Sequence, residues 1–154
     1  LLKDVATIGV SSIHLVGTIL GEKSYLDSTL IEENKIEKYL LEGASQAGST
    51  ILPTCTIYSS VYQFFEKMKI DKEVTKIIFD INYKNAPSMS ASDIKKNQSI
   101  WLSFGSERGW SEKERNIFYR EGFRSITLGK RILRTETACI VGLSYVLTCL
   151  GEYN

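Results

Sequence analysis

The chain has 154 residues, of which 43% are hydrophobic and 24% charged, which suffices for one sizeable core but not for two full domains. Its longest apolar run, near residues 138–150, is shorter than the roughly 20 residues that span a bilayer, so we expect neither a membrane segment nor a signal peptide. Cys55, Cys139 and Cys149 form no CxxC pair, and His14 is the single histidine. The composition therefore predicts one globular cytoplasmic domain with reduced thiols and no metal site.

The net charge of +1 does not by itself indicate a nucleic-acid partner, but the charges are unevenly distributed. Residues 1–71 carry six Lys and nine Asp or Glu, whereas residues 107–136 carry eight Lys or Arg and five acidic residues. Because phosphate contacts come mainly from Lys and Arg, the second stretch is a candidate nucleic-acid surface. An ordinary solvated helix face explains the same charges and, from charge alone, is the simpler interpretation.

The first half of the chain predicts a strand followed by two helices. Residues 10–19 are rich in β-branched and apolar residues, which favours a strand. A helix follows, because apolar residues recur at three- and four-residue spacing and Gly48 stands where the helix would end. The recurring residues are Ile36, Tyr39, Leu40, Ala44 and Ala47. Ser60 with Gln63 has the form of a capping box and predicts a short amphipathic helix over residues 61–68.

Two apolar runs in the middle of the chain have the length of strands. Residues 76–81 and 99–104 lack clean polar alternation, which is typical of buried parallel strands. The stretch 82–98 between them is polar and contains proline and several serines, so it predicts a loop.

The last third of the chain alternates helices with a strand. Ser111 with Glu114 forms a second capping box, which predicts a helix that ends at Gly122. Residues 123–128 predict a strand, and Thr135 is expected to cap a last helix that continues to about residue 150. Strands that alternate with helices indicate an α/β domain around a largely parallel sheet.

Ligands of α/β sheets bind outside the carboxyl ends of the strands, and three loops stand at such ends here. One follows Ile81, one covers residues 105–110, and one covers residues 129–134. Glycines in the second loop allow close backbone approach to a ligand, and the helix after it adds N–H groups. A GxxxG loop alone is more often a plain strand-to-helix turn, and this one lacks the GK[ST] ending of a nucleotide P-loop.

A more specific pattern covers residues 102–142, which read LSFGSERGWSEKERNIFYREGFRSITLGKRILRTETACIVG. The pattern resembles the C-terminal signature of the small-subunit ribosomal RNA (uracil-N3) methyltransferases of the SPOUT superfamily. The match rests on Leu128–Gly129, Arg131–Arg134 and Glu136–Ala138, at the family's distance from Gly105. The resemblance implies an α/β fold with a C-terminal trefoil knot, S-adenosylmethionine as cofactor, small-subunit ribosomal RNA as partner, and a homodimer.

The resemblance also implies which residues bind the cofactor and which take part in methyl transfer. The matching cofactor-binding positions are Gly105, Gly109, Leu128, Gly129, Ile132, Leu133, Thr137 and Ala138. Uracil N3 carries a proton at neutral pH, so its methylation needs a base or a cation that stabilises the deprotonated ring. Arg134, with Arg131 as helper, is the candidate for this role, and Glu107 for orienting the loop or the nucleotide. Ordinary ion pairs, with Glu136 or Glu107 for the arginines and with Arg108 for Glu107, explain these charges equally.

The chain also departs from the family pattern. Ser106 and Arg108 stand where the family has Pro and Gly, and Ser49 stands where it has an arginine. A divergent SPOUT domain that binds RNA or a partner without catalysis is therefore the alternative to an active enzyme, and a generic nucleotide-binding regulatory domain is a third, weaker possibility. Trp110 is expected as a core anchor and His14 as a partly buried strand residue. The family's N-terminal RNA-binding β-barrel does not fit within this chain, so residues 1–154 are expected to form the methyltransferase domain.

Overall fold

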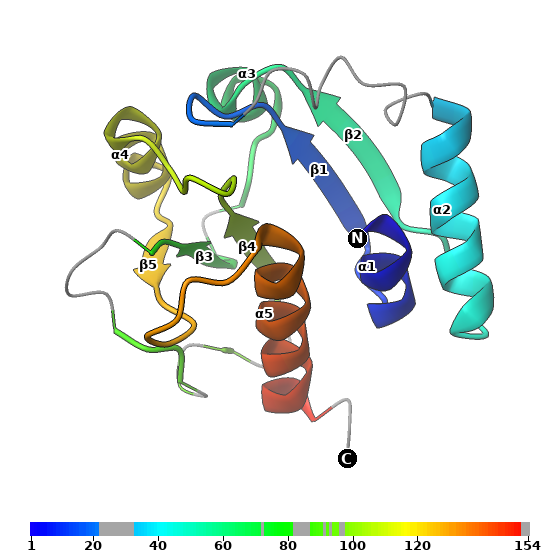
Figure 1. Ribbon diagram of the computed structural model, residues 1–154. Coiled ribbons are helices and arrows are strands. Elements are labelled where there is room, and N and C mark those ends of the chain that lie inside the picture. The colour runs from blue at the N-terminus through cyan, green and yellow to red at the C-terminus, as the bar shows by residue number, and fades with distance from the viewer. Residues whose placement is uncertain are drawn as a thin grey trace.

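Parallel strands connected by helices form the framework of the chain in the computed structural model (Figure 1). The structure describes residues 1–21, 33–71, 73–81, 87–90, 92, 94–95 and 98–151. The helices are α1 (Leu2–Ile8), α2 (Glu33–Gln46), α3 (Val61–Lys67), α4 (Glu112–Arg120) and α5 (Thr135–Leu150). The strands are β1 (Ser12–Val16), β2 (Thr54–Tyr58), β3 (Thr75–Phe79), β4 (Ile100–Phe104) and β5 (Arg124–Ile126).

The strands pair in two parallel sheets. One sheet joins β1 to β2, and the other has the order β4-β3-β5. In the second sheet Ile77 of the central strand lies opposite Leu102 on one side and Arg124 on the other. The predicted α/β class with parallel strands is confirmed, although the pairing is divided between two sheets where one was expected. The trefoil knot stays a prediction.

Strand β3 is enclosed from both faces. Ile77 and Ile78 are each 0% exposed and belong to different core clusters, because successive side chains of a strand point to opposite faces. Ile78 packs in a cluster with residues of α4, and Ile77 in a cluster that includes Val146 of α5. Trp110 is 3% exposed and belongs to the same cluster as Ile78, which confirms it as a core anchor.

Most local signals in the sequence correspond to observed elements. Helix α4 has the complete capping box of Ser111 and Glu114, and α2 ends two residues before Gly48, whose φ is +67°. The box at α3 is only half formed. The Ser60 hydroxyl accepts from the N–H of Gln63, but the Gln63 side chain accepts from Ser59 instead of Ser60.

Three features differ from the sequence prediction. Helix α1 and strand β2 were not predicted. Helix α1 has only seven residues and no side-chain cap, and β2, Thr-Cys-Thr-Ile-Tyr, contains residues that favour a strand but no apolar run. Thr135 does not cap α5, so that prediction is wrong. It is the first residue of the helix, Arg134 occupies the cap position, and the Thr135 hydroxyl donates to the carbonyl oxygen of Gly105 instead.

His14 lies in β1 as predicted, partly buried, with its ring stacked on Trp101 at a centroid distance of 5.1 Å. Neither ring nitrogen has a hydrogen-bond partner among the described residues, and burial lowers the pKa of the imidazole. A neutral aromatic role in the core therefore accounts for this residue. Across the part of the chain that the structure describes, the helices are too short or too polar to cross a membrane.

Helix α1 packs directly on α2 at Gly43, which generates a stability prediction. A Cβ atom at Gly43 would lie 2.3 Å from the carbonyl oxygen of Lys3 and 2.8 Å from the Cβ of Ala6. Gly43→Ala should lower the free energy of unfolding by about 2 kcal/mol, even though Ala is favoured over Gly in a helix by about 1 kcal/mol. The control is Ser45→Ala, at an exposed position of the same helix. Urea titrations in which Gly43→Ala is as stable as the wild type would contradict the close contact.

Candidate functional site

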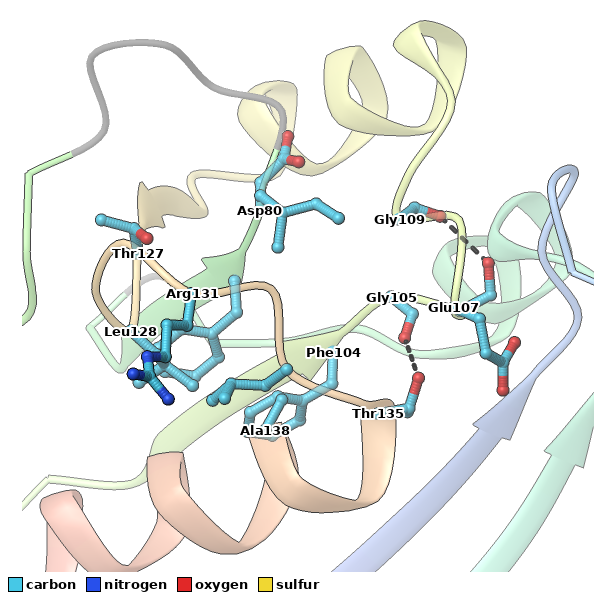
Figure 2. Close-up of a pocket in the computed structure, with 14 residues that line it drawn as sticks. Asp80, Phe104, Gly105, Glu107, Gly109, Thr127, Leu128, Arg131, Thr135 and Ala138 are labelled. Carbon is cyan, nitrogen blue, oxygen red and sulfur yellow. Dashed lines mark hydrogen bonds between the residues drawn. The ribbon is translucent and has the colours of Figure 1, made fainter.

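A narrow cavity of about 50 Å³ lies at the carboxyl ends of β3 and β4 (Figure 2). Three segments form its walls: residues 79–81 after β3, residues 104–109 after β4, and parts of 127–138 between β5 and the first turns of α5. Parallel pairing of β3 with its two neighbours brings these strand ends to one edge of the sheet. Two of the expected loops, 105–110 and 129–134, therefore meet beside the end of β3. The third was expected after Ile81, and its residues 82–86 lie outside the described residues.

Only part of the predicted site residues line this cavity. The residues that do so are Gly105, Glu107, Gly109, Leu128, Arg131, Leu133 and Ala138. Gly129, Ile132, Arg134 and Thr137 lie outside the lining and are exposed, Ile132 to 75%. The functional roles assigned to all eleven residues stay predictions.

Two aromatic rings that the sequence did not single out form an apolar wall. Phe79 and Phe104, the last residues of β3 and β4, are stacked with ring centroids 4.7 Å apart and an interplanar angle of 18°. Figure 2 shows Leu128 and Ala138 on the same side of the cavity as Phe104. Because the two rings stack on each other, they give the cavity an apolar lining of the kind that is common in ligand pockets. In the sequence, the feature that could have pointed to these two residues was their position near the ends of the predicted buried strands.

The loop after β4 closes on itself through backbone contacts that require glycine. The N–H of Gly109 donates to the carbonyl of Ser106 at 2.8 Å, and the Ser106 hydroxyl donates to the carbonyl of Gly109 at 3.1 Å. Gly109 has a φ of +73°, and a Cβ at Gly105 would lie 3.1 Å from the Gly109 backbone. Ser106 is thus used within the loop, and Arg108 is exposed and does not line the cavity.

The charged side chains at the cavity differ in their exposure, pairing and direction. Arg131 lines it and is exposed, whereas the side chain of Asp80 is 0% exposed and forms an ion pair with Arg115 of α4. Figure 2 shows the Glu107 carboxylate directed away from Asp80 and Arg131. Among the described residues, no ion pair joins Glu107 to Arg108. The Asp80–Arg115 pair was not predicted from the sequence, because its members are separated by 35 positions.

Glu114 joins the helix after this loop to the segment after β1. Glu114 is 1% exposed. One carboxylate oxygen accepts from the N–H of Ile19 at 2.8 Å, and the other accepts from the N–H and hydroxyl of Ser111 at 2.9 and 2.7 Å. The capping box was predicted from the sequence, but the bond to Ile19, which spans 95 positions, has no local signal.

The family to which the chain belongs follows from comparison with known proteins. The model of a family described as "RNA methyltransferase domain" matches residues 1–147. The chain belongs to this RNA methyltransferase domain family. The resemblance noted from residues 102–142 is thereby confirmed, and the family match extends over the first half of the chain, where the sequence patterns were weak.

Named relatives of this RNA methyltransferase domain include two spirochaete proteins. The chain is 44% identical over 150 residues to ribosomal RNA small subunit methyltransferase E of Treponema pallidum, covering 96% of this chain and 56% of the relative. It is 31% identical over 140 residues to ribosomal RNA small subunit methyltransferase E 1 of Borreliella burgdorferi, covering 91% of this chain and 57% of the relative. The chain thus spans less than three fifths of these relatives.

Solved structures share the fold of this domain. Ribosomal RNA small subunit methyltransferase E of Neisseria gonorrhoeae, bound to S-adenosyl methionine, matches with a TM-score of 0.75 and 26% identity, covering 96% of this chain and 58% of that one. A probable rRNA-methyltransferase of Porphyromonas gingivalis matches with a TM-score of 0.82 and 20% identity, covering 99% of this chain and 62% of that one. The second likeness concerns the fold alone.

The hydrogen bond from Thr135 to Gly105 generates a prediction about the cavity wall. The Thr135 hydroxyl donates to the Gly105 carbonyl at 3.1 Å, and Figure 2 shows how this bond joins α5 to the loop after β4. Thr135→Val has nearly the same shape but leaves that carbonyl without its donor. It should lower the free energy of unfolding by about 1 kcal/mol and speed amide exchange in residues 105–109. Thr135→Ser, which keeps the hydroxyl, is the control. Equal exchange rates in all three proteins would show that the bond does not hold the loop.

Proposed function

We propose that this chain is the catalytic domain of an S-adenosylmethionine-dependent methyltransferase that modifies uracil N3 in small-subunit ribosomal RNA in the cytoplasm. The observation that supports the proposal most directly is that the glycine loop 105–109 and the segment 128–138, both part of the family signature, line one cavity. The names of the Treponema pallidum and Borreliella burgdorferi relatives favour an enzyme over a binding domain without catalysis. Residues 1–154 form the methyltransferase domain in this proposal.

The residues around the cavity fit the cofactor by their chemistry. Phe79 and Phe104 supply apolar lining for an adenine ring, and Gly105 and Gly109, which also line the cavity, allow a ligand to approach main-chain groups. The bound cofactor would supply a methyl group activated on a sulfonium. Ligand cavities are typically at least about 300 Å³, so the cavity of about 50 Å³ must widen when the cofactor enters.

The protein's part in methyl transfer is alignment and stabilisation of charge. Alignment places the uracil ring in line with the methyl group, which removes much of the entropic barrier. A cation near the ring favours loss of the N3 proton by stabilising the resulting anion. Arg131 lines the cavity, and Arg134 is exposed at the start of α5, next to it in sequence and open to a large substrate. We propose Arg134 for the uracil or its phosphate, Arg131 as helper, and Glu107 for orienting the nucleotide.

Calorimetry and a methyl-transfer assay test this function together. S-adenosylhomocysteine should bind the wild-type protein with a one-site isotherm, and labelled methyl groups should pass to unmodified small ribosomal subunits. Arg134→Ala should reduce transfer about 100-fold while leaving the Kd for S-adenosylhomocysteine unchanged, because a charge used in the transition state affects turnover more than cofactor binding.

Two matched variants sharpen this experiment. Arg134→Lys keeps the charge without the planar fork, so partial recovery indicates Coulombic stabilisation and no recovery indicates a bidentate contact. Lys130→Ala removes an exposed cation of the same segment and should leave transfer unchanged. Absence of heat on titrating folded wild-type protein would refute the cofactor, and cofactor binding without transfer would refute the activity.

We also propose that the protein acts as a homodimer through α5. Ile140 and Val141 are 36% and 41% exposed on this helix, and exposed apolar residues of this kind favour a protein interface. Sedimentation should report a dimer at micromolar concentration. The double variant Ile140→Lys/Val141→Lys should be monomeric, whereas Thr148→Lys, at another exposed position of α5, should remain dimeric. A monomeric wild-type protein would disprove the interface.

A further inference from the structure

The backbone at the end of β3 forms one wall of the cavity, and Asp80 is the residue that ends it. Asp80 lines the cavity together with Phe79 and Ile81 and is 3% exposed. Its N–H donates to the carbonyl of Ile126 at 3.2 Å, which continues the pairing of β3 with β5. Figure 2 shows the Asp80 carboxylate pointing away from Leu128, so the side chain lies behind the wall rather than inside the cavity.

Behind this wall, the Asp80 carboxylate is held by a cation of α4. The Nε of Arg115 donates to Oδ2 of Asp80, and the two side chains are 19% and 0% exposed. A carboxylate taken out of water is destabilising by several kcal/mol unless it is paired and hydrogen-bonded. The distance between the end of β3 and α4 is therefore strongly constrained at this point.

A second bond constrains the residue before Asp80 in the same way. The indole Nε1 of Trp110 donates to the carbonyl of Phe79 at 3.0 Å within the core. Trp110 and Arg115 lie in one continuous segment that includes the loop after β4 and the start of α4. Two successive residues of the β3 end are thus attached to the segment that forms the neighbouring wall.

In the opposite wall, Thr135 joins the start of α5 to Gly105, but among the described residues the segment 129–132 has no comparable attachment to another wall. Its residues 129–132 are exposed, and Ile132 is exposed to 75%. Because the cavity of about 50 Å³ must widen for the proposed cofactor, one wall has to move while another keeps the cofactor in register. Because the segment 129–132 is exposed, moving it costs less free energy than moving a buried wall, so this is the wall that we expect to move.

From this arrangement we propose that Asp80 is a positioning residue for cofactor binding. Its ion pair with Arg115 fixes the wall formed by the β3 end and the loop 105–109, against which the cofactor is aligned. The proposal rests on the proposed function, because it assumes that S-adenosylmethionine binds in this cavity. Loss of the pair would change the position of a wall that the cofactor touches without removing any group that the cofactor touches.

A double-mutant cycle on the affinity for S-adenosylhomocysteine tests the proposal. Arg115→Gln leaves the buried Asp80 carboxylate without this cation and should weaken binding about tenfold, because small displacements of a binding wall are costly. Asp80→Asn keeps the shape and an acceptor and should weaken binding less. The double variant Asp80→Asn/Arg115→Gln should bind more tightly than Arg115→Gln alone, since it no longer buries a carboxylate that has lost the Arg115 cation. Arg115→Lys, which keeps the cation, should recover part of the affinity.

Two controls separate positioning from general stability. Gly43→Ala, at the distant α1–α2 contact, is expected to lower the stability of the protein. It should leave the Kd for S-adenosylhomocysteine unchanged at a temperature where the protein is folded. Lys113→Gln changes the charge of α4 at an exposed position and should also leave it unchanged. Wild-type affinity in both Arg115→Gln and Asp80→Asn, additive effects in the cycle, or an equal loss in Gly43→Ala would overturn the positioning role alone. Failure of the wild-type protein to bind would overturn the proposed function as well.

Discussion

The buried carboxylate of Glu114 is the constraint on which the arrangement of this domain depends. At 1% exposure it would be strongly destabilising without partners, and three donors from Ile19 and Ser111 compensate it. Among the described elements, the two sheets share no strand pairing. The bond from Glu114 to Ile19 therefore acts as one of the links between them, alongside the stacking of His14 on Trp101. A residue in the first turn of α4 thus also holds the segment that follows β1.

Strand β3 determines where the cavity lies within this framework. Its two faces belong to separate clusters, so α4 and α5 are both positioned relative to one strand, and the strand's end becomes the point where their preceding loops meet. Gly142 shows how closely α5 approaches, because a Cβ there would lie 2.9 Å from the ring of Phe104. The cavity is consequently formed by backbone and apolar groups that the core holds in place, and its exposed side is left to the segment before α5.

Local patterns predicted the elements that have a clear cap, periodicity or apolar run, and they missed the elements that have none of these. The Ser111–Glu114 box and the left-handed Gly48 are signals contained within a few residues, and both were found in the structure. Strand β2 contains Thr, Ile and Tyr, which favour a strand, but it has no apolar run, and its pairing with β1 is not visible in any window of the sequence. Helix α1 likewise depends on its contact with Gly43. Elements of five to seven residues carry too little local signal to be assigned without knowledge of the partner on which they pack.

The same limit applies to the candidate site, where the signature located the loops but not the direction of each side chain. Arg131 and Leu133 line the cavity, whereas Ile132 and Arg134 do not. Arg134 occupies the cap position of α5, and Ile132 and Arg134 are exposed whereas Leu133 is half-buried. A motif read as one block therefore divides into two functions within the proposed mechanism. Alternate residues are available to a ligand inside the cavity, and the residues between them are available to a large partner that approaches from solvent.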